Sequence, residues 1–248
     1  MNESLEQRWH ALRAWRQPFR PNDQAVVIAG TNGAKSTLVA TLTLPVPSLV
    51  ALDEKASLTL PDARIVELPF LPHERANGAR LITPEFSATL ANALAWRERP
   101  RDNRVIIRVH ALNIDDADVH DQIFRAAFTR GNTVIWVDEI TATGSSAHYI
   151  SPWLKACSAR GRTRGIGLWT CSQSAFGLVP VILRRNATYV IFGSSDPQDV
   201  ADIHRQDIEI ATGIPRKSGR FILYEAGDPT PYRLYLPIPP ALKGWTAP

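Results

Sequence analysis

The chain has 248 residues, of which 44% are hydrophobic and 21% charged, and its formal net charge is +4. This length allows one substantial core, and no apolar run approaches the roughly 20 residues that a membrane span needs. The cysteines, Cys157 and Cys171, form neither a C-x-x-C nor a zinc pattern. We therefore expect a reduced, cytosolic protein without stable membrane insertion, and the positive charge favours a polyanionic partner.

The N-terminal segment has the pattern of an amphipathic helix over residues 3–17, with Leu5 and Trp9 on one face. The following stretch, "RQPFRPNDQ", ends this helix because two closely spaced prolines cannot continue it. We expect residues 1–22 to form an N-terminal helix and linker that pack on their own domain. Residues 23–248 are predicted to form a single domain with a proline-rich C-terminal tail.

Apolar, β-prone runs then alternate with segments that favour helices. The runs predicted as strands are 24–29, 48–52, 63–67, 104–109, 133–137, 165–171 and 188–192. The segments predicted as helices are 36–43, 85–97, 117–129, 150–160 and 197–204. Continuously apolar strands separated by helices predict an α/β fold whose mainly parallel central sheet is flanked by helices. The stretch "GRFILYEAGDPTPYRLYLPIPP" predicts a C-terminal β-hairpin followed by the tail.

The first strand leads into a loop that is typical of phosphate binding, "AGTNGAKST". The P-loop pattern G-x-x-x-x-G-K-[ST], or Walker A motif, has glycine directly before its lysine, whereas this chain has Ala34. A helix N-terminus and loop amides can still bind the phosphates of ATP, with Lys35 reaching the β and γ phosphates and Ser36 holding Mg²⁺. The predicted phosphate-binding residues are Gly30, Thr31, Asn32, Gly33, Ala34, Lys35, Ser36 and Thr37.

The second motif, "NTVIWVDEI", is acidic. It places Asp138 and Glu139 at the end of a predicted buried strand. Open α/β sheets bind their ligands at the carboxyl ends of such strands. Two adjacent acids there suit a Walker B motif, in which Asp138 holds Mg²⁺ and Glu139 activates the water that attacks the γ phosphate. An acidic strand end followed by a polar loop is the structural alternative.

In the stretch "ACSARGRTRGIGLWTCSQS", Gln173 follows a further predicted strand. Its side chain could contact the γ phosphate or the attacking water. Before this strand stand Arg160, Arg162 and Arg164. A guanidinium that reaches the γ phosphate of a neighbouring subunit is an arginine finger. The alternatives are a turn residue for Gln173 and a solvated basic helix end for the arginines.

The order of these motifs resembles the FtsK/HerA superfamily of P-loop motors, and most of all its compact viral genome-packaging ATPases. Asp53 and Lys55 resemble a D-x-K motif of that family. The resemblance implies a RecA-like P-loop NTPase fold of the additional-strand, catalytic-glutamate type. It also implies a site in cis and a finger in trans. The cis residues would be Lys35, Ser36, Asp138, Glu139 and Gln173, and the trans finger would be Arg160 or Arg162.

The same resemblance implies an enzyme that hydrolyses ATP with Mg²⁺ and moves double-stranded DNA through a ring, usually a hexamer. The expected role is packaging of a viral genome into a preformed capsid, with capsid vertex or portal proteins as partners. The expected location is the host cytoplasm, with association with the virion as an alternative. A motor that tolerates every sequence would contact phosphates. The basic residues proposed for this contact are Arg75, Arg80, Arg184 and Arg185.

Three other functions remain open. The loop also resembles that of Mur-type and folylpolyglutamate ligases, although the lysine is displaced by one position and the chain is shorter than those enzymes. A motor of the same superfamily could serve conjugation, chromosome transfer or phage assembly. An assembly factor could bind ATP without translocating DNA.

His110 and His120 lack a third ligand, which favours ordinary histidines over a metal site.

Overall fold

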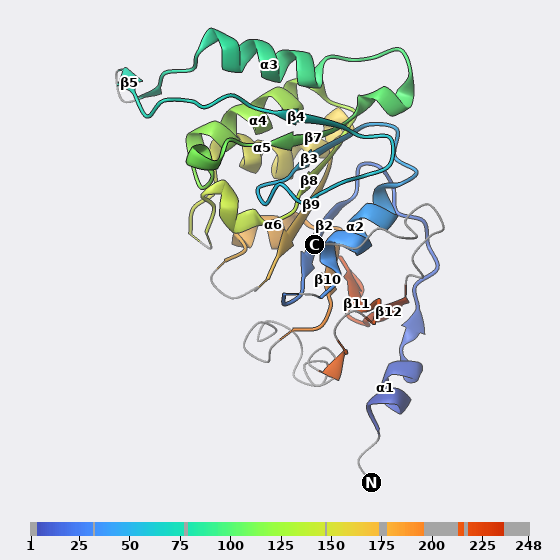
Figure 1. The fold of residues 1–248 in the computed structure, drawn as a ribbon. Helices are drawn as coiled ribbons and strands as arrows, with labels where there is room; N and C mark the ends of the chain where they lie inside the picture. Colours follow the sequence, from blue (N-terminus) through green and yellow to red (C-terminus); the bar gives the residue numbers. More distant parts are fainter. Residues whose placement is uncertain are drawn as a thin grey trace.

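The computed structural model describes residues 4–31, 33–76, 79–146, 148–173, 178–195, 213–215 and 218–235. Its main feature is a ten-stranded sheet with the strand order β1-β12-β11-β10-β2-β9-β8-β3-β7-β4 (Figure 1). The strands are β1 (Arg13–Ala14), β2 (Gln24–Ile28), β3 (Leu49–Leu52), β4 (Arg64–Glu67), β7 (Arg104–Arg108), β8 (Val134–Val137), β9 (Gly167–Ser172), β10 (Tyr189–Phe192), β11 (Arg220–Glu225) and β12 (Tyr232–Tyr235). A separate small hairpin consists of β5 (Arg75–Ala76) and β6 (Ala79–Arg80).

From β10 across to β4, all neighbouring strands of the sheet are parallel. Strands β11 and β12 form the predicted antiparallel hairpin beside β10. The predicted α/β fold with a mainly parallel sheet is therefore confirmed. Every predicted parallel strand is present within one or two residues, and the central strands β2, β3, β8 and β9 are buried throughout, as their apolar runs indicate.

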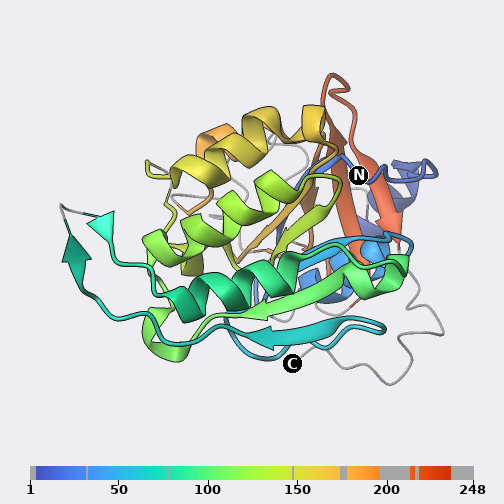
Figure 2. The same ribbon diagram turned by 90° about the horizontal axis from the view of Figure 1, so that it is seen from above.

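Helices cover both faces of this sheet. The α-helices are α1 (Leu5–Ala11), α2 (Lys35–Thr43), α3 (Pro84–Leu94), α4 (Ala117–Arg130), α5 (Pro152–Arg160) and α6 (Val181–Asn186). Short 3-10 helices are η1 (Pro100–Asn103), η2 (Ala111–Asn113), η3 (Ile140–Thr143) and η4 (Gly161–Arg164). Figure 2 shows α3, α4 and α5 side by side in one layer over the sheet. None of the described helices has the length and hydropathy of a membrane span.

Two apolar clusters fill the space between the helices and the sheet. Val26 and Ile28 of β2 belong to the cluster beneath α3, α4, α5 and α6. The alternate residues, Ala25 and Val27, pack in the second cluster with Leu38 of α2. Since successive side chains of a strand point to opposite faces, one apolar run supplies both cores.

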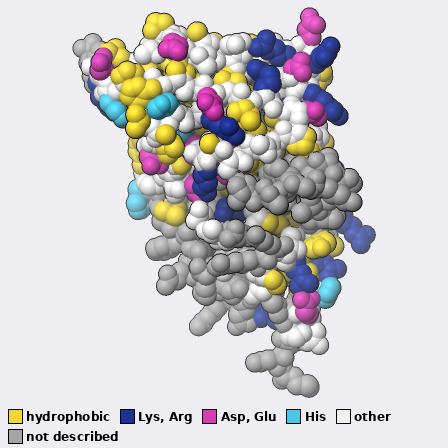
Figure 3. Space-filling model, in the orientation of Figure 1, with side chains coloured by type: hydrophobic (Ala, Val, Ile, Leu, Met, Phe, Trp, Pro, Cys, Tyr) yellow, Lys and Arg dark blue, Asp and Glu magenta, His cyan; other side chains and the backbone are white. Residues whose placement is uncertain are grey.

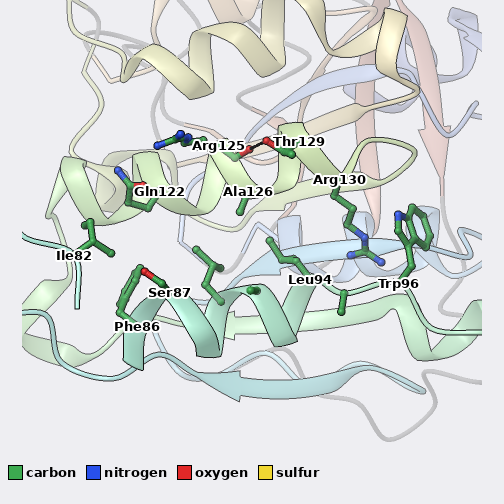
Figure 4. Close-up of a pocket in the computed structure, with 13 residues that line it drawn as sticks. Ile82, Phe86, Ser87, Leu94, Trp96, Gln122, Arg125, Ala126, Thr129 and Arg130 are labelled. Atoms are coloured by element: carbon green, nitrogen blue, oxygen red, sulfur yellow. Dashed lines mark hydrogen bonds between the residues drawn. The ribbon is translucent and has the colours of Figure 1, made fainter. Parts of the chain in front are cut away.

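A groove of about 420 Å³ lies between α3 and α4 (Figure 4). Phe86, Leu90 and Leu94 of α3 line it, and at one end Arg130 of α4 lies 4.4 Å from the centre of the Trp96 ring. None of the predicted site residues lines this groove. It therefore belongs to the packing of the helical layer.

The predicted helix over residues 3–17 is wrong beyond Ala11. Ser4 caps α1 through a capping box, but Leu12 is extended, and Arg13–Ala14 pair with β12 instead. The cause is the packing of the half-buried Trp15 against the C-terminal hairpin, where its ring centre lies 5.1 Å from that of Tyr232. Long-range aromatic packing therefore overrides the local helical pattern. The predicted helix over residues 197–204 and the proline-rich tail lie outside the described residues.

Trp9 tests whether the N-terminal segment belongs to this core. Its side chain is 5% exposed and packs in the cluster under the helical layer. We predict that Trp9→Ala lowers the free energy of unfolding by about 3 kcal/mol, because a large buried side chain leaves a cavity. Denaturant unfolding measures the change, and Arg16→Ala, at an exposed position, is the control. Equal stability of the two variants would mean that α1 is a detachable appendage.

Candidate nucleotide-binding site

The loop between β2 and α2 is held in place by the ends of two neighbouring strands. The Gly30 amide donates to the Ser194 carbonyl at 2.7 Å, beyond β10, and the Ala29 amide donates to the Ser172 carbonyl at 3.2 Å, at the end of β9. Within the loop, the Gly33 amide donates to the Gly30 carbonyl at 2.9 Å. The loop therefore lies at the carboxyl edge of the sheet, where α/β folds bind ligands.

Gly33 is required by a close approach of the backbone. A Cβ atom at this position would lie 2.6 Å from the Ala29 Cβ and 2.8 Å from the Gly30 oxygen. Ala34, by contrast, occupies the glycine position of the usual motif and adopts a left-handed conformation, with φ 62° and ψ 25°. The turn that glycine normally makes is therefore made here by a residue that is strained in it.

Helix α2 starts directly after this turn, and no side chain caps its N-terminus. The amides of a helix's first turn have no partner within the helix, and the helix dipole is positive at this end. Lys35 adds a charge, since its Nζ donates to the carbonyl oxygens of Ala29 and Gly30. Burial lowers the pKa of Lys35, partly offset by Glu139 and Asp138. This arrangement suits a polyanion, which would replace the two carbonyl oxygens as the partner of the ammonium.

The side chains of Ser36 and Asp138 meet across the sheet. Ser36 Oγ donates to Asp138 Oδ1 at 2.8 Å, although their strands, β2 and β8, are separated by β9. Asp138 is 7% exposed. Burial raises the pKa of Asp138, while the bond from Ser36 and the charge of Lys55 oppose the rise. A hydroxyl and a carboxylate this close can share one cation.

Glu139 lies beside this pair, at the start of η3, and is also 7% exposed. Its Oε1 accepts from Thr141 Oγ1 at 3.1 Å, whereas Oε2 is buried and has no hydrogen-bond partner among the described residues. Burial raises the pKa of Glu139, against the bond from Thr141 and the charges of Lys55 and Lys35. A buried carboxylate oxygen without a donor is costly, and it suits a group that receives a proton.

Gln173 follows β9 and faces the loop, where Thr31 Oγ1 donates to Gln173 Oε1 at 3.2 Å. The inserted strand β9 thus places an amide between the lysine loop and the paired acids. The structure brings Lys35, Ser36, Asp138, Glu139 and Gln173 to one edge of the sheet, as predicted. Asn32 lies outside the described residues.

The predicted finger residues lie elsewhere. Arg162 Nη2 donates to the Asn186 carbonyl and to Thr188 Oγ1, both at 2.9 Å. Thr188 precedes β10, so Arg162 and the neighbouring Arg160 lie at the amino edge of the sheet, opposite the nucleotide loop. The structure therefore does not bring Arg160 and Arg162 to the chain's own candidate site.

The four arginines predicted to contact DNA differ in exposure and in the partners of their guanidinium groups. The Arg80 side chain is 4% exposed and forms an ion pair with Asp116 at 2.9 Å, so this guanidinium is occupied inside the fold and does not suit a DNA contact. Arg75 is more exposed, on the projecting β5–β6 hairpin, and pairs with Asp118 at 2.7 Å. Arg184 and Arg185 end α6, close to Arg162. Figure 3 shows another group of basic side chains, mixed with acidic ones, over the connection between α3 and β7.

Sequence reasoning missed two contributors to the site. Thr141 binds Glu139, and a hydroxyl two residues after an acid was the available signal. Lys55 belongs to the D-x-K motif, to which the sequence assigns no role in the site, yet the charge of Lys55 opposes the rise in the pKa of both acids.

The residues present fit ATP and Mg²⁺. The uncapped helix and Lys35 would bind the phosphates, and Ser36 with Asp138 suits Mg²⁺, which usually takes few protein ligands and several waters. The described residues contain no cluster of three or more histidine, cysteine or acidic ligands.

Two neighbouring substitutions test the loop geometry. We predict that Ala34→Gly raises the free energy of unfolding by about 1 kcal/mol, because glycine relieves the left-handed strain. Gly33→Ala should lower it by about 2 kcal/mol, because the new Cβ meets Ala29. The control is Ala91→Gly on the exposed side of α3, which should lose about 1 kcal/mol. A loss of stability in Ala34→Gly, measured by denaturant unfolding, would contradict this conformation.

No family model and no curated protein sequence matches the chain. Solved structures do match. The genome packaging NTPase B204 of Sulfolobus turreted icosahedral virus 2, in complex with sulfate, has a TM-score of 0.63 at 16% identity, over 89% of this chain and 99% of that one. VirB4 of Thermoanaerobacter pseudethanolicus has a TM-score of 0.55 at 11% identity, over 88% and 90%. The plasmid coupling protein TrwB, with a non-hydrolysable GTP analogue, has 0.53 at 11%, over 87% and 86%. The chain therefore shares the RecA-like fold of these P-loop NTPases, as expected from the resemblance in motif order.

Proposed function

We propose that the protein is a Mg²⁺-dependent ATPase. The observation that carries this proposal is the meeting of Ser36 and Asp138 at 2.8 Å, with Lys35 and the unpartnered oxygen of Glu139 on the same edge of the sheet. A phosphate-binding loop and a strand-end acid pair converge there from strands that β9 separates. This convergence is difficult to explain by packing alone, since both acids lose hydration through burial.

In the proposed mechanism, Lys35 and the first amides of α2 bind the β and γ phosphates, while Ser36 and Asp138 hold the metal. Mg²⁺ neutralises phosphate charge when bound. Glu139 takes a proton from the attacking water as the water oxygen bonds to the γ phosphorus, and the bond from that phosphorus to the bridging oxygen of ADP breaks. Gln173 orients this water. Burial raises the pKa of Glu139, which makes its carboxylate a better proton acceptor than an exposed glutamate.

We further propose that ATP hydrolysis drives translocation of double-stranded DNA, with packaging of a viral genome into a capsid as the role. Support comes from the likeness to B204, a genome packaging NTPase, over nearly the whole of both chains. The likeness to VirB4 and TrwB supports conjugation as the second candidate. In either role the subunits form a ring, with six as the expected number, and portal or vertex proteins of the capsid are the partners in packaging.

In a ring, the amino edge of the sheet would face the site of the neighbouring subunit. Arg160 or Arg162 of one subunit would reach the phosphates in the next subunit, since neither can reach its own. Arg75, Arg184 and Arg185 remain the proposed DNA contacts, and the occupied guanidinium of Arg80 is left out. The proposed location is the host cytoplasm, and the division into residues 1–22 and 23–248 stays a proposal.

The catalytic assignment is tested with Glu139→Gln. We predict that this variant binds ATP normally but hydrolyses it at least about a hundredfold more slowly, because an amide cannot take the proton of the water. Steady-state phosphate release and equilibrium nucleotide binding are measured together. Glu98→Gln is the matched control, since Glu98 is exposed and outside the site. Hydrolysis at the parental rate in Glu139→Gln would refute the role given to this residue.

A second assay tests the motor proposal. We predict that double-stranded DNA stimulates hydrolysis and that the stimulation weakens steeply with salt, because the contacts are made to phosphates. A ligase of the Mur or folylpolyglutamate type would instead require an amino-acid or peptide substrate. An assembly factor would bind ATP without a response to DNA. Phosphate release with and without DNA, over a range of salt concentrations, separates the three.

A further inference from the structure

The segment after β3 lies beside the acids of the candidate site. Leu52 of β3 pairs with Val137 of β8, so the two chains leave the sheet at the same level. Asp53 is fully buried and fixes the start of this segment. Its carboxylate pairs with Arg108 at 3.1 Å and accepts the amides of Ser57 and Leu58 at 3.0 and 2.9 Å. Residues 53–58 therefore form a compact turn beside the end of β8, where the paired acids lie.

Lys55 extends from this turn and is exposed. Its charge lowers the pKa of Asp138, of Glu139 and of Lys35, so the ammonium lies within electrostatic range of all three groups. Among the described residues, Lys55 has no hydrogen bond or ion pair. Two lysines thus face the same acids from different strands, and only Lys35 has hydrogen-bond partners.

The residue before Lys55 is locked by a buried ion pair. Glu54 Oε1 lies 2.9 Å from His120 Nε2, and the two side chains are 3% and 0% exposed. On the other side of the ring, Nδ1 lies 2.9 Å from the carbonyl oxygen of Asp116. A carbonyl and an ionised carboxylate only accept hydrogen bonds, so with Glu54 ionised both ring nitrogens donate and the ring is an imidazolium.

The charged groups around His120 agree with this protonation state. Burial by itself lowers the pKa of His120, but the bond to Glu54, its charge and the groups of Asp116 raise the pKa above its ordinary value. The Asp116 carboxylate is in turn paired with Arg80. A buried charge with a bonded partner is stable, whereas either partner alone would be costly.

Helix α4 gives this ion pair a rigid support. Asp116 caps the helix by accepting the amides of Asp118 and Val119. Asp121 accepts the Trp153 amide of α5 at 2.8 Å, which ties the helix to its neighbour. Since α4 is fixed at these points, His120 holds Glu54 in place, and the Asp53 contacts hold the other side of Glu54. Lys55 therefore leaves the turn in a defined direction.

We propose that Lys55 is a second phosphate-binding cation of the site and that His120, through Glu54, is the positioning residue that aims it. This inference rests on the proposed function and deepens it, because it assigns recognition of a triphosphate to a pair of lysines. Bound ATP adds negative charge beside two buried acids. Lys55 offsets that charge without a hydrogen-bond partner to give up, and the backbone of its turn, which Asp53 already holds, loses no further entropy on binding.

Direct binding tests the role of Lys55. The probes are the β,γ-methylene analogue of ATP, which is not hydrolysed, and AMP. We expect Lys55→Gln to weaken binding of the analogue about tenfold, the scale of a charge-assisted contact, and to leave AMP binding unchanged. Lys155→Gln, at an exposed position of α5, is the matched control. An unchanged affinity for the analogue in Lys55→Gln would overturn the proposal.

A double-mutant cycle tests the positioning role. We expect His120→Gln to weaken binding of the analogue in the parental chain but not in Lys55→Gln, because its effect passes through Lys55. The paired change Glu54→Gln with His120→Gln removes both charges together and leaves neither of them unpaired, so it serves if His120→Gln unfolds. Equal loss of affinity in both backgrounds would show a merely structural role for His120.

The pH dependence supplies an independent readout. Because the folded-state pKa of His120 is raised, the stabilisation that it provides is fully present below its unfolded pKa and is lost as pH rises through the folded pKa. We expect analogue affinity of the parental chain to fall over that range relative to the Glu54→Gln, His120→Gln variant. A pH-independent ratio of the two affinities would overturn the positioning role.

The outcomes separate this inference from the proposed function. If Lys35→Ala abolishes analogue binding while Lys55→Gln has no effect, the nucleotide site stands and only the inference fails. If the parental chain binds no nucleotide, both fail. If binding responds to Lys55 as expected but Glu139→Gln still hydrolyses ATP, the inference stands and the catalytic assignment fails.

Discussion

The site depends on the parallel register of β2, β9 and β8. Ile28 of β2 pairs with Ser172 of β9, and Val137 of β8 pairs with Thr170 of β9, so the three strands end within a few residues of one another. Parallel strands point their carboxyl ends to the same edge, and this alone brings the lysine loop, the amide and the acids together. A shift of one residue in β9 would turn its side chains to the opposite faces and displace Gln173 from Thr31.

The second constraint is electrostatic. Asp138 and Glu139 lose hydration by burial, and the charges of Lys35 and Lys55 oppose the resulting rise in their pKa values. The site is thus a balance of buried charges, in which hydrogen bonds satisfy only part of each group. Among the described residues, the buried Oε2 of Glu139 still lacks a hydrogen-bond donor. Beside a phosphate-binding loop and a second buried acid, such an oxygen suits a site in which a ligand supplies the missing hydrogen-bond donor.

The fold was predictable in its centre and less so at its edges. Runs such as residues 104–109 and 133–137 have a continuous apolar centre, Val105–Ile107 and Val134–Val137, which is typical of a strand buried on both faces. The N-terminal pattern failed because β1 is decided by packing of Trp15 against Tyr232, a residue more than two hundred positions away. The β5–β6 hairpin and α6 have no strong periodicity, and they were missed for that reason.

The sequence by itself determined the chemical groups of the site and their order along the chain, because a glycine-bearing lysine loop and a strand-end acid pair are local patterns. It also determined that both motifs would lie at strand ends. The tertiary structure alone decided that β9 separates their strands, that Ser36 touches Asp138, that Arg80 is occupied, and that His120 pairs with Glu54. These contacts join residues distant in the chain, and their partners are selected by burial and by the need to pair buried charges, which no local pattern encodes.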